Sequence, residues 1–392
     1  MLFCGEIAMM TKSFTVENAS IVTPSGVLRG ASLKVDDGFI STIREGAINS
    51  HGKRVDAKGG YLLPGFIDLH SDAVEKEIEP RPNSYFPVNV AIYELDKKLA
   101  AAGVTTIFHA LSFAEGEIGI RSNDMAAKII TEITRLSPKF SVKTMVHARF
   151  EITDAGAVPY LEELLAAGKI HLLSLMDHTP GQGQFREVAA FKNYYGRVYK
   201  KSDEELNNII DRKLTAKEQA KSDIGHVIEL CKSLRVPLAS HDDDSEEKIR
   251  WLDDMQIMIS EFPVTMEALR AAQAHNIQVC LGSPNVLRGN SQAKNLSARD
   301  AIAAGFGDIL CSDYSPMTML HAVFALHELG ILPLYQAVNM ASINPANAVG
   351  ISGQTGSLEE NKFADIIVVD MSHEVPKIVK TFVAGCEVYS AC

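Results

Sequence analysis

The chain has 392 residues, of which 46% are hydrophobic and 22% charged, and its formal net charge is −11. This composition is ordinary for a globular protein, and the absence of a basic stripe argues against nucleic acid as the main partner. The six cysteines show no CxxC spacing, and no apolar run approaches the roughly 20 residues needed to span a membrane. We therefore expect a reduced, cytoplasmic protein that does not cross a membrane.

Both ends of the chain are predicted to be rich in β-strands. Residues 1–61 alternate apolar and polar side chains between Gly and Asp turns, and residues 352–392 return to the same pattern. Alternation with a period of two is typical of half-buried strands. The pattern predicts one small β-sandwich domain that is built from both ends of the chain.

The middle of the chain, residues 62–351, alternates short apolar runs with amphipathic helical segments. Eight such strand–helix units predict an α/β fold, a (β/α)8 barrel that forms the catalytic domain. A doubly wound open sheet is the alternative, but no Gly-rich nucleotide fingerprint follows the first strand. The predicted strands lie within residues 61–70, 104–112, 142–152, 170–178, 236–243, 256–263, 277–284 and 308–316.

A long insertion separates the fourth predicted strand from the fifth. Residues 180–222 are polar, partly helical and basic. Connections of this length inside a compact domain usually cover or line a binding site. The insertion is therefore predicted to be a lid or a binding element.

Histidines and carboxylates gather where the predicted strands end. In a (β/α)8 barrel the carboxyl ends of the strands form the active-site face. Side chains two residues apart lie on the same side of a strand, so His70 and Asp72 would point into the barrel mouth together. Imidazole and carboxylate ligands suit Zn²⁺, Mn²⁺ or Fe²⁺, and this set is large enough to hold two ions. The predicted metal ligands are His70, Asp72, Glu151, His178, His241 and Asp313.

Each of these residues also has a purely structural alternative. A single histidine at a strand end is more often a hydrogen-bonded structural residue, and Asp72 and Asp313 could equally cap helices. The acidic run 241–247 is predicted to be mostly a solvated helix cap, with only His241 turned inward. Lys143 could bridge two metals if it were carboxylated, but it begins its strand and so lies at the wrong end of the barrel. Agreement among five strand ends favours the metal site.

Several motifs resemble the amidohydrolase superfamily. The segment "PGFIDLHSD" (64–72) is similar to the first-strand signature of that superfamily, which usually ends in His-x-His. In this chain Asp72 stands where the signature has its second histidine. "GVTTI" (103–107), "SINPANAVGI" (342–351) and "GSLEENKFADIIVVD" (356–370) are also typical, so the resemblance spans nearly the whole chain. The more specific motifs "HARFE" (147–151), "LMDHTPGQGQFR" (175–186) and "GSPNVLRGNS" (282–291) resemble the PhnM branch of that superfamily.

The resemblance implies a metal-dependent hydrolase of phosphonate catabolism. The member that defines the branch is a diphosphatase, which hydrolyses α-D-ribose 1-methylphosphonate 5-triphosphate to the 5-phosphate and pyrophosphate. Asp313 is then expected to carry a proton from the attacking water to the leaving group. Guanidinium groups match phosphate oxygens in pairs. The expected substrate-binding residues are Arg81, Arg149, Arg186, Arg288, His147 and His109.

Two other functions stay open at this point. The same site could cleave a cyclic amide or another C–N bond, as many amidohydrolases do. A barrel that has lost its metals could instead act as an assembly protein, but such a chain would lack histidines on strands one, four or five, and each of these keeps one. The apolar faces of the β-rich domain are compatible with a homodimer.

Overall fold

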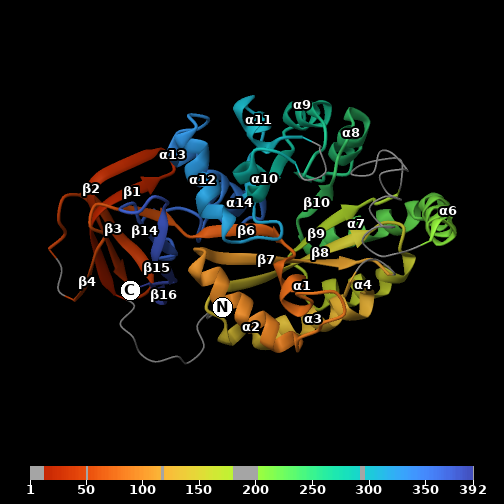
Figure 1. Ribbon diagram of the computed structural model, residues 1–392, viewed down its shortest axis with the longest axis horizontal. Coiled ribbons are helices and arrows are strands. Elements are labelled where there is room, and N and C mark those ends of the chain that lie inside the picture. The colour runs from red at the N-terminus through yellow and green to blue at the C-terminus, as the bar shows by residue number, and fades with distance from the viewer. Residues whose placement is uncertain (1–12, 50–51, 116–118, 180–201, 292–295, 392) are drawn as a thin grey trace.

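The computed structural model describes residues 13–391, apart from 50–51, 116–118, 180–201 and 292–295. Its strands form two eight-stranded sheets. Figure 1 shows one sheet at the left end of the molecule and the other, surrounded by helices, beside it. The described part of the predicted insertion begins with a long helix, and the prediction of a lid at residues 180–201 falls outside the described residues.

The central sheet is a barrel of parallel strands that follow one another in chain order. A parallel bridge between Ser71 and Asp313 joins its first strand to the segment after its last strand and so closes the circle. The (β/α)8 prediction is therefore confirmed. The strands are β6 (Phe66–Ser71), β7 (Val104–Phe113), β8 (Lys143–Glu151), β9 (Leu172–Met176), β10 (Leu238–His241), β11 (Ile259–Glu261), β12 (Gln278–Gly282) and β13 (Ile309–Cys311).

Helices surround the barrel, and α3 (Asn123–Leu136) shows how an apolar stripe packs against it. In this helix, Ile129, Ile130 and Ile133 are buried, and the Ser122 side chain accepts a hydrogen bond from the Met125 amide at the helix start. The other helices among the described residues are α1 (Ala73–Ile78), α2 (Val88–Ala101), α4 (Val158–Ala166), α6 (Asp203–Gln219), α7 (Lys221–Leu234), α8 (Glu246–Asp254), α9 (Met266–Ala274), α10 (Ser283–Arg288), α11 (Ala298–Ala303), α12 (Thr318–Glu328), α13 (Leu334–Met340) and α14 (Ile343–Ala348), with 3₁₀ turns η1 (Ser137–Lys139) and η2 (Ala155–Ala157).

The second sheet takes its strands from both chain ends, as predicted. Its order is β16-β15-β14-β5-β1-β2-β3, and β4 pairs with β1. These strands are β1 (Phe14–Thr23), β2 (Gly26–Asp36), β3 (Phe39–Glu45), β4 (Lys53–Asp56), β5 (Tyr61–Pro64), β14 (Ile366–Asp370), β15 (Lys377–Val383) and β16 (Cys386–Ser390). A division of the chain into domains at residues 61 and 352 stays a prediction.

A single glycine connects the two sheets. Gly65 lies between β5 of one sheet and β6 of the barrel. A Cβ at this position would lie only 2.2 Å from the Oγ1 atom of Thr105 on the neighbouring barrel strand. The chain can pass from sheet to barrel here only because glycine has no side chain.

The barrel base is fastened to the second sheet by a buried ion pair. Lys143, at the start of β8, lies with its Nζ atom 2.5 Å from Asp365 Oδ2. The other carboxylate oxygen of Asp365 accepts the Ala384 amide at 2.8 Å, and Thr355 donates its hydroxyl to the same carboxylate. Lys143 Nζ also lies 4.3 Å from the centre of the Phe363 ring. Lys143 therefore has a structural role at the end of the barrel opposite to the mouth.

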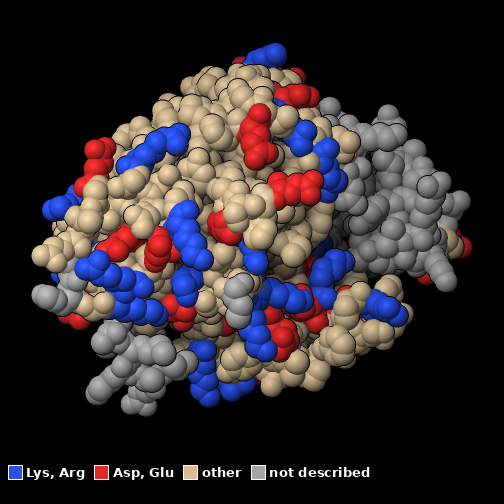
Figure 2. Space-filling view, turned by 60° about the vertical axis from the view of Figure 1, so that its left-hand side comes forward, with Lys and Arg blue, Asp and Glu red and all other residues tan. Residues whose placement is uncertain are grey.

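The barrel interior below the mouth is apolar. Its packed layer comprises Ile67, Leu69, Phe108, Leu172, Ala239, Ile259, Cys280, Ile309 and Cys311. No helix in the described part of the chain is both long and apolar enough to cross a membrane. On the face drawn in Figure 2, basic side chains lie among acidic ones, in agreement with the mixed charge pattern of the sequence.

Candidate metal centre at the barrel mouth

The residues just after three barrel strands adopt a left-handed backbone conformation. Asp242, Phe262 and Asp313 have φ values of 54°, 52° and 57°. Their amides donate to the neighbouring strand end: Asp242 to Glu261 O and Asp313 to His70 O, both at 2.9 Å. Such a conformation costs about 1–3 kcal/mol for a non-glycine residue and is concentrated at functional sites. Here it turns two carboxylates toward the mouth.

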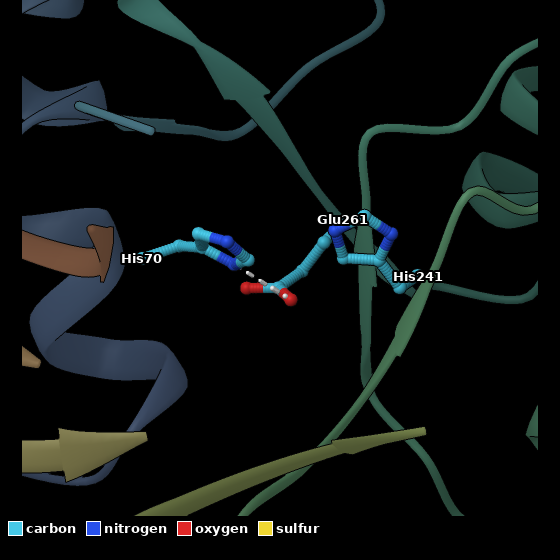
Figure 3. A group of neighbouring side chains, drawn as sticks. All are labelled: His70, His241 and Glu261. Carbon is cyan, nitrogen blue, oxygen red and sulfur yellow. Dashed lines mark hydrogen bonds and ion pairs between the residues drawn. The ribbon is translucent and has the colours of Figure 1, made fainter. Parts of the chain in front are cut away.

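One group of metal-ligating atoms comes from β6, β10 and β11. Figure 3 shows the side chains of His70, His241 and Glu261 facing one another across the mouth. One ligand atom from each lies within 4.8 Å of the other two, and all three side chains are buried. Glu261 Oε2 is 3.1 Å from His70 Nδ1, whereas its buried Oε1 has no hydrogen-bond partner among the described residues.

A second group shares His241 with the first. The ligand atoms of His178, His241 and Asp242 also lie within 4.8 Å of one another. His241 Nδ1 and Asp242 Oδ2 are 3.2 Å apart but do not form a hydrogen bond, and both atoms are buried. Glu151, which ends β8, lies beside this group, with Oε2 3.2 Å from His178 Nδ1. Thr153 donates its hydroxyl to the other oxygen of Glu151 at 2.6 Å.

The prediction of a solvated cap over 241–247 is wrong for its first aspartates. Asp242 is buried, and Asp243 is completely enclosed. The Asp243 carboxylate accepts hydroxyls from Ser240 and Ser260 at 2.6 and 2.5 Å and pairs with Lys248 Nζ at 2.9 Å. Together these partners offset the cost of burying its charge. The cap itself is Ser245, whose side chain accepts the Lys248 amide.

Asp72 and Asp313 meet where the barrel closes. The Asp72 amide donates to Asp313 O at 2.8 Å. Asp72 precedes α1 but its side chain does not cap that helix, and α12 starts at Thr318, so the two helix-cap alternatives do not hold. Burial, followed by the nearby charge of Asp72, raises the pKa of Asp313 to about 7. The Asp72 Oδ2 atom lies 3.2 Å from Arg121 Nη2.

His109 and His147 lie deeper in the barrel wall. Burial lowers the pKa of His109 to about 4 and the pKa of His147 to about 3. Both ring nitrogens of His147 have protein partners, Leu69 O at 2.9 Å and Ser174 Oγ at 2.8 Å. The Nδ1 atom of His109 is buried without a partner among the described residues. A substrate contact is therefore open to His109 and not to His147 in this arrangement.

The predicted substrate arginines differ in position. Arg149 is buried beside the metal-ligating group, with Nη2 3.4 Å from His241 Nε2 and an Nε atom that has no partner among the described residues. Arg81 and Arg288 are exposed, and Arg288 is bonded to the Tyr314 hydroxyl. Arg186 lies outside the described residues. The structure thus brings Arg149 to the centre of the site.

Sequence reasoning missed three residues that belong to this region. Glu261 ends the sixth barrel strand, so the strand-end rule that selected His241 on the fifth strand would have found it. Asp242 was hidden in a run of acidic residues. Arg121 gives no local signal because it lies in a turn before α3, far in sequence from Asp72, the carboxylate that it contacts.

The donor set fits a divalent metal. Asp72 Oδ1, Asp242 Oδ2 and Glu261 Oε1 are buried acceptors without hydrogen-bond partners among the described residues, and so is His241 Nδ1. A buried polar atom left unpaired costs about 1–3 kcal/mol. Three of these atoms belong to residues of the two ligand groups, His241, Asp242 and Glu261, whereas Asp72 belongs to neither group. The mixture of imidazole and carboxylate in these groups suits Zn²⁺, Mn²⁺ or Fe²⁺.

Comparisons with known proteins identify the family of the chain. The amidohydrolase family model matches residues 198–389. The chain is 31% identical over 358 residues to the alpha-D-ribose 1-methylphosphonate 5-triphosphate diphosphatase of Escherichia coli K12, covering 90% of this chain and 94% of that protein. The chain belongs to the amidohydrolase family. The resemblance to the diphosphatase branch is thereby confirmed, and the protein is a metal-dependent hydrolase.

Other similar proteins carry the names of different hydrolases. A dihydroorotase of Thermoanaerobacter sp. is 23% identical over 92% of this chain and 88% of its own length. Among solved structures, N-acetylglucosamine-6-phosphate deacetylase from Pasteurella multocida superposes with a TM-score of 0.65 at 14% identity, covering 97% of this chain and 100% of that one. At that identity the likeness shows the fold alone.

Proposed function

We propose that this amidohydrolase is a diphosphatase that hydrolyses α-D-ribose 1-methylphosphonate 5-triphosphate to the 5-phosphate and pyrophosphate. The proposed site holds two divalent ions, Zn²⁺, Mn²⁺ or Fe²⁺. The Escherichia coli relative, named for this substrate and similar along nearly its whole length, supports the proposal. The proposed ligands are the six predicted from the sequence, together with two that the structure brings beside them, Glu261 and Asp242. The six are His70, Asp72, Glu151, His178, His241 and Asp313.

The environment of Arg149 is the observation that supports a phosphate substrate. Its guanidinium is buried at the metal-ligating mouth, and no carboxylate of the described residues pairs with it. A buried guanidinium that no carboxylate holds directly keeps its N–H groups available for an anionic ligand. A pair of phosphate oxygens would match the guanidinium fork, whereas a neutral cyclic amide such as a hydantoin offers it no anion.

The chain's own groups define what each part of the site does. Divalent ions, when bound, acidify water and neutralise charge on phosphate oxygens. Arg149, buried beside His241, orients the anion through its guanidinium fork. Asp313, at the closing bridge, is placed to accept a proton from the attacking water and to return it to the departing pyrophosphate.

The experiment is a direct assay of the metal-loaded protein. We expect pyrophosphate release from ribose 5-triphosphates in the presence of Mn²⁺ or Zn²⁺. Asp313→Asn should lower turnover by about 10³-fold or more while metal content stays near normal, because the amide keeps one oxygen but cannot take up the proton. Retained turnover in that variant would contradict the proton-transfer role, and orthophosphate as the first product would contradict the diphosphatase.

A panel of substrates with a C–N bond to be hydrolysed distinguishes the alternative activity from the diphosphatase. Dihydroorotase is among the relatives, so a cyclic amide substrate has support from sequence similarity. Hydantoins, dihydroorotate and acyl amino acids should be turned over far more slowly than triphosphates. Faster hydrolysis of any of them would replace the proposed function. A cytoplasmic location and a homodimer stay predictions of the sequence.

A further inference from the structure

One oxygen of the Asp72 carboxylate is hydrogen-bonded, and the other has no hydrogen-bond partner among the described residues. Its Oδ2 atom accepts from Arg121 Nη2 at 3.2 Å, whereas Oδ1 is shielded from solvent and has no hydrogen-bond partner among the described residues. The side chain is not used to cap α1, although it stands at the cap position. A carboxylate held through one oxygen with the second left open is the arrangement of a metal ligand that is oriented from behind.

Arg121 is itself held from the opposite side. Its Nε atom donates to both carboxylate oxygens of Glu75, at 3.1 and 2.9 Å, and its Nη2 lies 2.9 Å from Glu75 Oε2. Glu75 lies on α1, one turn after Asp72, whereas Arg121 precedes α3. One guanidinium therefore joins two carboxylates of α1 to a separate part of the chain.

Electrostatic attraction favours the contact of Arg121 with these two carboxylates. Burial raises the pKa of Glu75, and the charge of Arg121 is the largest effect that opposes this rise. The guanidinium of Arg121 contacts both carboxylates and so offsets the repulsion between them. Arginine suits the place because its planar fork can serve two carboxylates at once in a fixed geometry.

We propose that Arg121 is a positioning residue that directs the Oδ1 atom of Asp72 toward a divalent metal ion, and that Glu75 fixes Arg121 for this task. The proposal rests on the metal centre of the proposed function, but it concerns metal binding and not the substrate. Arg121 acts through Asp72 and has no contact with the reacting atoms in this assignment. The competing explanation is a salt bridge that only fastens α1 to the start of α3.

The test measures metal affinity of the stripped protein by competition of Mn²⁺ or Zn²⁺ with a chromophoric chelator. Arg121→Met should weaken binding about 10–100-fold, the usual effect of losing a residue that orients a ligand. Arg121→Lys, which keeps the charge and loses the fork, should fall between Arg121→Met and wild type. Arg135→Met is the matched control, because this exposed arginine makes a similar fork with Glu132 on α3 and should leave affinity unchanged.

A double variant separates positioning from general stability. If Arg121 works only through Asp72, then Asp72→Asn/Arg121→Met should bind metal no more weakly than Asp72→Asn alone, because effects on one shared ligand do not add. Additive losses would overturn the proposal, as would wild-type affinity in Asp72→Asn. Wild-type affinity in an Arg121→Met protein that melts early would establish the salt-bridge explanation instead.

Two further variants protect the test against misfolding. If Arg121→Met does not fold, Arg121→Lys and Glu75→Gln carry the comparison, since both retain the volume of the side chain and weaken the grip. Each should bind metal less tightly than wild type, and unchanged affinity in both would overturn the proposal. A protein that shows these affinity losses but does not hydrolyse triphosphates would contradict the proposed function alone.

Discussion

The barrel carries buried charges at both ends, and the two ends treat them differently. At the base, every charged atom of the Lys143–Asp365 pair has a protein partner. At the mouth, Glu261 Oε1 and the Nε atom of Arg149 are buried without one among the described residues. Satisfied buried charges stabilise one structure, whereas unsatisfied ones mark a place prepared for a ligand. Substitutions at the two ends should therefore have different effects on stability and on activity.

The largest effect is expected from breaking the pair at the base. Lys143→Met should lower the free energy of unfolding by roughly 3–5 kcal/mol, because it leaves the Asp365 carboxylate buried without its cation. Urea unfolding of the stripped protein measures the change, and Lys34→Met at the exposed Lys34–Asp36 pair is the control. Turnover of the folded fraction should stay unchanged, and a strong loss of turnover would show that the base also affects the mouth.

The corresponding substitution at the mouth should lower activity and leave stability nearly unchanged. Arg149→Met should lower kcat/KM for a triphosphate about 100-fold, or ~2.7 kcal/mol in transition-state stabilisation. Stability should change little, because the guanidinium makes no ion pair with a carboxylate of the described residues and the variant therefore breaks none. Exposed Arg250, which pairs with Glu246 on α8, provides the control substitution Arg250→Met. Clear destabilisation by Arg149→Met would mean that the guanidinium serves the fold.

A smaller effect is expected for the carboxylate that sequence reasoning missed. Glu261→Gln should weaken binding of Mn²⁺ or Zn²⁺ about 10–30-fold, since the amide keeps the shape of the side chain and loses its charge. Asp96→Asn is the control, because Asp96 is a buried carboxylate that accepts the Ser141 and Val142 amides away from the mouth. Chelator competition measures both variants. Equal affinity losses in the two would point to a general loss of stability and not to a ligand.

The sequence predicted the barrel better than it predicted the mouth. Each strand is a local apolar run with a polar end, so all eight could be read directly from the chain. The burial of Asp243 depends on hydroxyls from two different strands, Ser240 and Ser260. The contact between Arg121 and Asp72 joins residues 49 positions apart. Such non-local partners decide whether a carboxylate in an acidic run is solvated or enclosed, and periodicity carries no information about them.

The smallest effect tests whether the buried ring of His109, whose Nδ1 atom has no partner among the described residues, makes stability depend on pH. Burial lowers the pKa of His109 to about 4, below that of the unfolded chain, so the unfolded state binds one more proton between about pH 6.5 and 4. Stability from this group is therefore present above pH 6.5 and is lost as pH falls. His109→Leu should remove about 1 kcal/mol of the decrease in unfolding free energy between pH 7 and 5.5. Urea unfolding of the metal-free protein at the two pH values measures this change in the free energy of unfolding.

The control is His226→Leu, which replaces an exposed histidine and should leave the decrease between pH 7 and 5.5 intact. If His109→Leu showed the same decrease as wild type, His109 would be hydrated or paired in solution.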